Sequence, residues 1–331
     1  MLANLTKLRY VLPLILAGGI AVLICLNDRD PIHRIESHER LEHNFYEYLD
    51  GVTNQTYPGP YVYRILVPTT LSFLHRMVPV LSPLNIDFVV KFLLLVLCQA
   101  LFFAYQRLFF DPTKSFLGVA LLDVLIGFAL VQLEGPTLIE TMDILNVTVF
   151  LLAFMTIYLD YFKWFCIILF IGTLNRETTF LLPIIFLIVN GINRKSVYKT
   201  LVAFVAVGLP YVALHILIHP AVTDWIRFDA IAHNIPFIGQ FGNPKILLAN
   251  IHLLVLLGPL TLLALYDFSK HSKFLKSVSY IAPLFVLIHY VVGVIMEARL
   301  WMPLFIILIP LAIDTIARLY PNAPDYESIR T

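Results

Sequence analysis

Long apolar runs dominate the sequence, and their lengths are close to that of a membrane-spanning helix. A helix needs about 20 mainly apolar residues to cross the hydrocarbon core of a bilayer. With 331 residues, 59% hydrophobic and 14% charged, and a mean hydropathy of +0.83, the chain has more apolar surface than a soluble core of this size can bury. We therefore predict an all-α fold, a polytopic transmembrane helical bundle that forms a single integral membrane domain over residues 1–331.

The apolar runs predict about eight full membrane spans and one interrupted segment. The predicted spans are residues 10–26, 87–108, 116–133, 145–162, 197–218, 246–266, 278–296 and 300–319. The interrupted segment, residues 164–191, carries Arg176 and Glu177 near its middle. Charge is costly to bury in hydrocarbon, so an ionisable pair in such a segment indicates a functional site. The structural alternative is that these two side chains only neutralise each other or cap a broken helix.

The basic residues predict which loops face the cytoplasm, because short cytoplasmic loops are rich in lysine and arginine. Lys7 and Arg9 precede the first span and no small-residue cleavage site follows it, so we expect an uncleaved signal anchor, with both termini cytoplasmic. The loops that we place inside contain Arg107, Lys114, Lys163, Arg194, Lys195, Lys199, Lys270, Lys273, Lys276 and Arg318.

This assignment requires residues 164–191 to enter and leave the membrane on the same side. A helix of about 10 residues rises about 15 Å, so a re-entrant helix pair that meets at residues 175–178 is geometrically possible. A single crossing by this segment is the alternative. It would place the lysines of residues 270–276 outside and Glu297 inside, against the charge rule.

The predicted external face collects the unusual polar sequence. Residues 27–83 are expected to form an external loop and, from residue 65, an interfacial helix or a partial re-entrant segment that Pro68 and Pro79 interrupt. Arginine's planar fork suits phosphate oxygens, and a carboxylate can act as a general base. The candidate bases are Asp50 and Glu47, then Asp143, with Asp28, Asp30 and Glu42 also open. The candidate substrate-binding residues are Arg64, Arg176 and Arg299 for a phosphate, and Glu177 and Glu297 for orienting those arginines or a sugar.

Three short strings resemble segments of the type C glycosyltransferase-like (GT-C) group of small bacterial membrane proteins. They are Pro60–Pro68 (PYVYRILVP), Gly172–Thr178 (GTLNRET) and Glu297–Pro303 (EARLWMP), within a similarity that covers roughly residues 40–310. The resemblance implies a catalytic carboxylate in the first external loop, a lipid-phosphate-sugar donor and no nucleotide-sugar domain. Larger members carry an acidic pair soon after the first span, whereas Asp28 and Asp30 are separated here by Arg29.

These features together predict a membrane glycosyltransferase that moves a sugar, with inversion, from a polyprenyl-phosphate donor to a lipid or glycan acceptor at the external face. One alternative is a polysaccharide polymerase or ligase that uses lipid-diphosphate donors. The other is a lipid or solute transporter, for which polar residues would continue from the external face through to the cytoplasmic side.

The expected partners are the lipid-linked donor, the acceptor and membrane lipids, in a bacterial cytoplasmic (inner) membrane as the resemblance implies. A net charge of +1 argues against nucleic acid as a partner. The ten histidines and three cysteines lack metal-ligand spacing, so we predict no metal site and no cofactor, although a divalent cation carried in by the phosphate stays open. Asp123, inside a predicted span, is expected to pair with Lys91 or Arg107 in a structural role.

Overall fold

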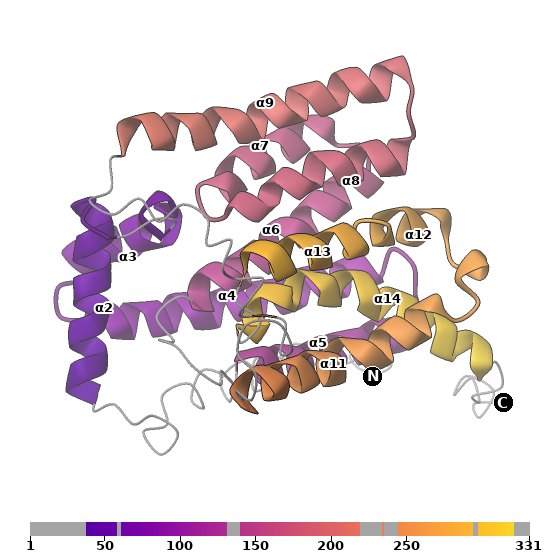
Figure 1. Ribbon diagram of the computed structural model, residues 1–331, viewed down its shortest axis with the longest axis horizontal. Helices are drawn as coiled ribbons and strands as arrows, with labels where there is room; N and C mark the ends of the chain where they lie inside the picture. The colour runs from indigo at the N-terminus through magenta and orange to yellow at the C-terminus, as the bar shows by residue number, and fades with distance from the viewer. Residues whose placement is uncertain are drawn as a thin grey trace, which may run out of the picture.

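The computed structural model describes residues 38–57, 61–130, 140–218, 234, 244–293 and 297–320. The predicted span 10–26, the candidate acids Asp28 and Asp30 and most of the loop 219–245 lie outside the described residues. Within the described ranges, all regular secondary structure is helical (Figure 1). The prediction of an all-α fold is therefore confirmed for this part of the chain.

Seven stretches of the described chain are long and apolar enough to cross a membrane. Five are the single helices α4 (Pro83–Gln106), α5 (Pro112–Leu130), α6 (Glu140–Tyr158), α9 (Arg194–Leu217) and α11 (Pro244–Leu265). The sixth combines α12 (Lys273–Ser279) with α13 (Ala282–Val292), and the seventh combines the 3₁₀ turn η5 (Ala298–Trp301) with α14 (Met302–Leu319). Each coincides, within a few residues, with a span predicted from the sequence, and together they indicate a multi-pass membrane protein.

Side-chain caps and special backbone positions explain where several of these helices begin and end. The Ser82 hydroxyl accepts a hydrogen bond from the Asn85 backbone N–H, and Pro83 occupies the first helical position of α4. Asn193 caps α9 in the same way, through the Ser196 backbone N–H. The preceding helix, α8 (Leu181–Asn190), ends at Gly191, whose φ of 73° is unfavourable for a residue with a Cβ.

The interrupted segment folds back on itself as a helical hairpin. Its arms are α7 (Phe162–Thr173) and the pair formed by η3 (Glu177–Phe180) and α8. The Phe165 and Phe186 rings, one from each arm, stack with centroids 5.4 Å apart. At the open end, Lys199 Nζ of α9 lies 3.1 Å from Asp160 Oδ1 and 5.1 Å from the centre of the Phe162 ring. The start of α7 and the end of α8 therefore lie at the same end of the bundle. This is the geometry expected of a re-entrant pair.

Most of the described lysines and arginines in the connections and near the helix termini lie at this same end of the bundle, which we call the basic end. Contacts between helix termini place it: Phe274, next to Lys273 at the start of α12, packs on Phe109 and Tyr158 at the ends of α4 and α6. Its described basic residues are Arg107, Lys114, Lys163, Arg194, Lys195, Lys199, Lys270, Lys273, Lys276 and Arg318. These are the residues that the charge rule assigns to one side of the membrane.

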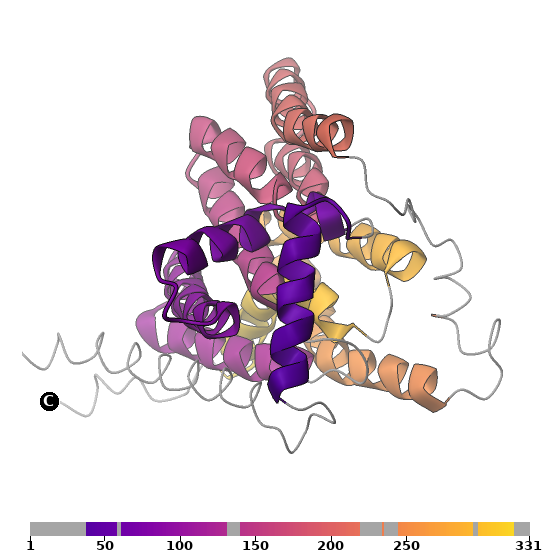
Figure 2. The same ribbon diagram turned by 90° about the vertical axis from the view of Figure 1, so that its left-hand side faces the viewer.

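Two helices lie across the opposite end of the bundle. Figure 2 shows α2 (His38–Thr53) and α3 (Leu66–Met77) crossing this end at a steep angle to the long helices. A separate hydrophobic cluster joins them, with Phe45 and Val52 of α2 and Leu71 of α3 buried against Ile86 of α4. The helix predicted after residue 65 thus corresponds to α3, which lies across this end of the bundle and continues through Pro68 without interruption.

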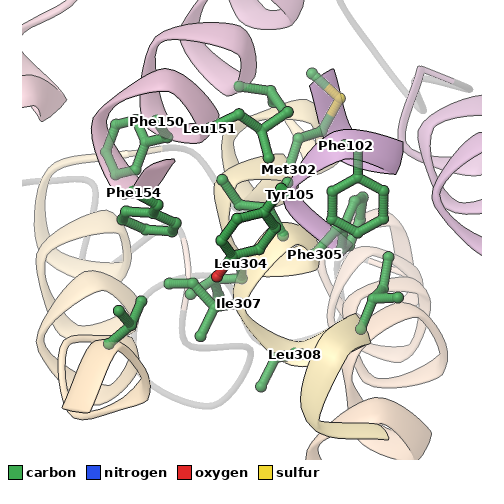
Figure 3. Close-up of a cluster of buried hydrophobic side chains, with 14 of the residues drawn as sticks. Phe102, Tyr105, Phe150, Leu151, Phe154, Met302, Leu304, Phe305, Ile307 and Leu308 are labelled. Carbon is green, nitrogen blue, oxygen red and sulfur yellow. The ribbon is translucent and has the colours of Figure 1, made fainter. Parts of the chain in front are cut away.

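The main core lies between the middle helices, where α4, α6 and α14 contribute the aromatic and aliphatic side chains shown in Figure 3. α6 and α14 are the central helices. In the most apolar stretch of each span, 72% of α6 and 78% of the span formed by η5 and α14 are buried, whereas only 28% of α9 and 28% of α11 are buried. The exposed faces of α9 and α11 consist of leucine, isoleucine and valine side chains such as Leu201, Val205 and Leu254. A lipid environment suits such faces.

Candidate functional site

A buried carboxylate, Asp143, lies between two arginines at the end of the bundle that α2 and α3 cover. Asp143 Oδ1 lies 2.7 Å from Arg176 Nη1, and Asp143 Oδ2 lies 3.2 Å from Arg299 Nε. The side chains are 1% (Asp143) and 3% (each arginine) exposed. Each ion pair is therefore largely removed from water, and removal of Asp143 would leave two buried guanidinium groups without the carboxylate that they share.

The three charges come from separate parts of the chain that meet at this end. Asp143 occupies the first turn of α6, where an acidic side chain is favoured by the helix dipole. Arg176 lies in extended backbone (φ −155°, ψ 144°) at the apex between α7 and η3. Arg299 lies in η5, which leads into α14. Asn175 fixes the apex against α6, because its side-chain amide donates a 2.9 Å hydrogen bond to the Met142 carbonyl.

Arg64 adds a third guanidinium through a two-point contact with Glu177. Arg64 Nε and Nη2 donate to Glu177 Oε1 and Oε2 at 3.3 and 3.1 Å. Burial by itself would lower the pKa of Arg64, but the charge and hydrogen bonds of Glu177 raise the pKa above its ordinary value. A backbone hydrogen bond of 3.1 Å from Leu66 N–H to the Leu174 carbonyl holds the start of α3 against the apex.

Glu297 completes the cluster by accepting a 3.0 Å hydrogen bond from Arg299 Nη2. Arg176 and Glu177 thus have different principal partners, Asp143 and Arg64, so the alternative in which they only neutralise each other does not describe the cluster. The structure brings six of the predicted site residues together, from four regions of the sequence: Asp143, Arg64, Arg176, Glu177, Glu297 and Arg299.

Several arginine donors in this cluster lack an aligned acceptor. The Nε of Arg176 and the Nε and Nη1 of Arg299 are buried without a hydrogen-bond partner among the described residues. The contact between Arg299 Nε and Asp143 is close in distance, but its geometry is not that of a hydrogen bond. Buried polar groups are normally paired, so the site presents donor capacity that an anion can use.

Tyr61 is a member of this site that the sequence analysis did not single out. It begins η1 (Tyr61–Tyr63), and the Arg64 guanidinium carbon lies 5.2 Å from the centre of its ring. Burial and the charge of Glu297 raise the pKa of Tyr61, although Arg64, Arg299 and Arg176 act in the opposite direction. The hydroxyl therefore remains protonated at neutral pH and is a donor beside the arginines. The segment Pro60–Pro68, which contains Tyr61, could have indicated that this residue belongs to the site. A tyrosine alone is a weak indication, because tyrosine is common at membrane interfaces.

A second buried charge cluster lies beside the first and was also missed. Lys91 Nζ lies 3.1 Å from Glu140 Oε2 and 3.8 Å from Asp87 Oδ2, and Thr141 donates a 2.6 Å hydrogen bond to Asp87. The sequence feature that could have indicated this second cluster is Lys91, a lysine inside the predicted span 87–108. The expected pairing of Asp123 with Lys91 or Arg107 is wrong, because Asp123 Oδ1 accepts a 2.7 Å hydrogen bond from Gln99. Gln99 lies directly opposite it, whereas Lys91 has acids of its own.

The remaining candidate acids lie away from the arginines. Asp50 and Glu47 are exposed on α2, and the Asn54 amide donates a 2.8 Å hydrogen bond to Asp50. Glu42, on the same helix, is half-buried. Among the described residues, the structure gives none of these three a hydrogen bond or ion pair with an arginine of the cluster. Of the three acids predicted first as catalytic bases, only Asp143 contacts the arginines there.

No group of three or more histidine, cysteine, aspartate or glutamate side chains in the described ranges is arranged to hold a metal ion. The fold and the site together define a multi-pass helical membrane protein with a buried arginine–carboxylate cluster at one end of its bundle. Comparison of the sequence with family models and with curated proteins gives no match.

Proposed function

We propose that the protein is a membrane glycosyltransferase of GT-C-like architecture that transfers a sugar from a polyprenyl-phosphate donor to a lipid or glycan acceptor. The observation that carries the proposal is the convergence of Arg64, Arg176 and Arg299 at one end of an apolar bundle, with buried N–H groups that have no aligned acceptor. Guanidinium groups bind phosphate oxygens through several N–H donors at once. A lipid phosphate at the bilayer surface supplies those oxygens.

In this proposal the carboxylates hold the arginines in position before the donor arrives. Asp143 contacts Arg176 and Arg299, while Glu177 contacts Arg64. The acceptor hydroxyl attacks the anomeric carbon from the face opposite the phosphate, so the configuration inverts. The bond between that carbon and the phosphate oxygen breaks, and the negative charge that develops on the phosphate is stabilised by the arginines.

We place the cluster at the external face of a bacterial cytoplasmic membrane. The support is the collection of lysines and arginines at the opposite end of the bundle, which the positive-inside rule assigns to the cytoplasm. The helices α2 and α3 would then belong to the external loop and interfacial helix predicted over residues 27–83. The donor's polyprenyl chain would lie against the exposed apolar faces of the bundle.

The transporter alternative is disfavoured by the distribution of buried polar residues along α4. Lys91, Gln99 and Gln106 all lie on its buried face, but Leu95 and Phe102 separate them and are 0% exposed. Successive polar residues are thus about 10–12 Å apart along the helix axis. These two apolar residues interrupt the row of polar residues along α4, which argues against a continuous polar route along this helix.

A transfer assay tests the proposal. Membranes that contain the wild-type protein, Arg176→Lys or Arg299→Lys at matched levels are given radiolabelled polyprenyl-phosphate sugars, and label in extractable lipid and glycan is counted. We expect transfer by the wild type and a loss of about 100-fold or more in each variant, because lysine cannot replace the guanidinium fork. Arg107→Lys, at the basic end, is the matched control and should retain transfer. Absence of transfer by the folded wild type, from monophosphate and diphosphate donors alike, would reject the proposal.

A further inference from the structure

We infer that His289, in the last turn of α13, is the base that takes the proton from the acceptor hydroxyl. This inference rests on the proposed function and assigns a catalytic role that the predicted acids do not fill. Asp143 is engaged in ion pairs with two arginines, at 2.7 and 3.2 Å, although neither of its oxygens accepts an aligned hydrogen bond among the described residues, whereas Asp50 and Glu47 are exposed on α2. A base is still required close to the arginines.

The structure holds the His289 ring in one orientation and one tautomer. The ring stacks on Phe285, with centroids 4.0 Å apart and an angle of 16° between the planes. Nδ1 lies 2.9 Å from the Phe285 carbonyl oxygen. A carbonyl only accepts hydrogen bonds, so Nδ1 carries the hydrogen, and in the neutral ring Nε2 has the lone pair. Orientation of a histidine base by such a contact is the usual arrangement in general-base catalysis.

Nε2 remains available for a substrate. The residue is 6% exposed, yet Nε2 has no hydrogen-bond partner among the described residues. By contrast, both ring nitrogens of His271, which is also buried in the described part of the chain, have close polar partners: Nδ1 lies 2.6 Å from Asp314 Oδ2 and 3.2 Å from Arg318 Nη2, and Nε2 lies 3.1 Å from the Ala264 carbonyl oxygen. His271 is at the basic end, and both of its ring nitrogens are already engaged by the protein.

His289 lies beside the arginine cluster. The positive charges of Arg176 and Arg64 both act on its ring. Its other ring neighbour is Trp301, which is two residues after Arg299 and whose ring centroid is 5.6 Å away. The charged groups that act on the imidazole are therefore the same guanidinium groups that would bind the donor phosphate, while the side chains packed on it, Phe285 and Trp301, are uncharged.

The proton transfer is balanced by a change of charge on the phosphate. As the acceptor oxygen bonds to the anomeric carbon, its proton moves to Nε2 of His289. The electron pair of the broken carbon–oxygen bond stays on the phosphate, which becomes a monoester with one additional negative charge. The imidazolium thus forms beside Arg176 and Arg64 in the step in which their anionic partner gains charge. Transfer of the proton to water then restores the neutral ring.

Substitution of His289 by asparagine tests the role, since an asparagine amide can still donate to the Phe285 carbonyl but has no basic nitrogen. We expect kcat for transfer to fall about 100-fold or more, with the donor KM changed by less than about threefold. The wild-type rate should rise with pH through the titration of the base, and this dependence should be lost in His289→Asn. Imidazole added to His289→Ala should restore part of the activity.

His271→Asn is the matched control, because it removes a buried histidine from the opposite end; its transfer rate should stay within about threefold of the wild-type rate. Retained transfer in His289→Asn, with an unchanged pH dependence, would overturn the inference. If that variant does not fold, the inference depends on His289→Gln and on the rescue of His289→Ala by imidazole, and normal transfer by His289→Gln would reject it. Failure of the wild type to transfer sugar would instead count against the proposed function.

Discussion

Asp143 Oδ1 and Arg176 Nη1 lie 2.7 Å apart and join the first turn of α6 to the apex of the α7–α8 hairpin. The same carboxylate contacts Arg299, so a single acid links two arginines that are far apart in the sequence. The hairpin is thereby fixed to the centre of the bundle by charge as well as by packing.

Substitution of Asp143 by alanine should destabilise the protein strongly. It would leave Arg176 and Arg299 buried without their shared partner, a type of change that costs about 3–5 kcal/mol. We expect a clear fall in the thermal midpoint of the detergent-solubilised protein. Lys270→Ala is the control, because Lys270 and its partner Asp267 are 62% and 43% exposed and such surface pairs contribute about 0–1 kcal/mol. Equal thermal midpoints for the two variants would show that the cluster contributes nothing to stability.

A double-mutant cycle on Arg64 and Glu177 should reveal coupling between the start of α3 and the apex. The two-point contact, with distances of 3.3 and 3.1 Å, predicts a coupling free energy of about 1–3 kcal/mol between Arg64→Gln and Glu177→Gln. The measurement is the unfolding midpoint of the wild type, both single variants and the double variant. Additive effects would mean that the pair forms no stabilising contact.

Gly172 allows α7 to approach α6 closely, and its replacement by alanine should disturb the apex. An added Cβ would lie 2.6 Å from Val149 Cγ1 and 2.9 Å from Thr179 Cγ2. We expect a loss of about 1–3 kcal/mol in stability and partial recovery in Gly172→Ala with Val149→Ala. Gly208→Ala, in α9, is the matched control, since an added Cβ there has no neighbour within 4 Å. The control should be neutral or slightly stabilising.

Tyr61→Phe should reduce sugar transfer while leaving the fold intact. The change removes a protonated hydroxyl from a ring whose centre lies 5.2 Å from the Arg64 guanidinium carbon, and a hydrogen bond to a charged group contributes about 1.5–3 kcal/mol, or about 10–100-fold in rate. Tyr57→Phe is the control, because Tyr57 belongs to the same ring cluster and packs edge-on against both Tyr48 and Tyr61. A rate for Tyr61→Phe equal to that of the control would exclude the hydroxyl from the site.

Asp50→Asn and Glu47→Gln should transfer sugar at rates within about threefold of the wild type, since surface substitutions away from a site usually have small effects. Both side chains are exposed on α2. Glu47 acts electrostatically on Tyr57, so a small change in donor KM is compatible with this expectation. A loss of kcat in either variant would place the base on α2 and argue against His289.

The positions of the spans and of the hairpin could be predicted because both depend on local patterns. Arg176 and Glu177 interrupt an apolar run, and the basic residues on either side of that run show that its ends lie together. Which charged side chains pair with each other could not be predicted from local sequence patterns. Asp143 and Arg176 are 33 residues apart, and their contact depends on how α7 packs on α6. Neutral members such as Tyr61 and His289 disturb no hydropathy pattern and are recognised only from their neighbours in space.

The distribution of the ion pairs also bears on the order in which the chain enters a membrane during synthesis. Arg299 has Glu297 only two residues before it, and Lys91 has Asp87 one helical turn away. Asp143 and Arg176 belong to the consecutive helices α6 and α7–α8, so they can meet before α14 has been made. In these three cases a charged segment can therefore be accompanied by an opposite charge from itself or from the neighbouring segment. These charges would not have to wait unpaired in hydrocarbon for the last helix.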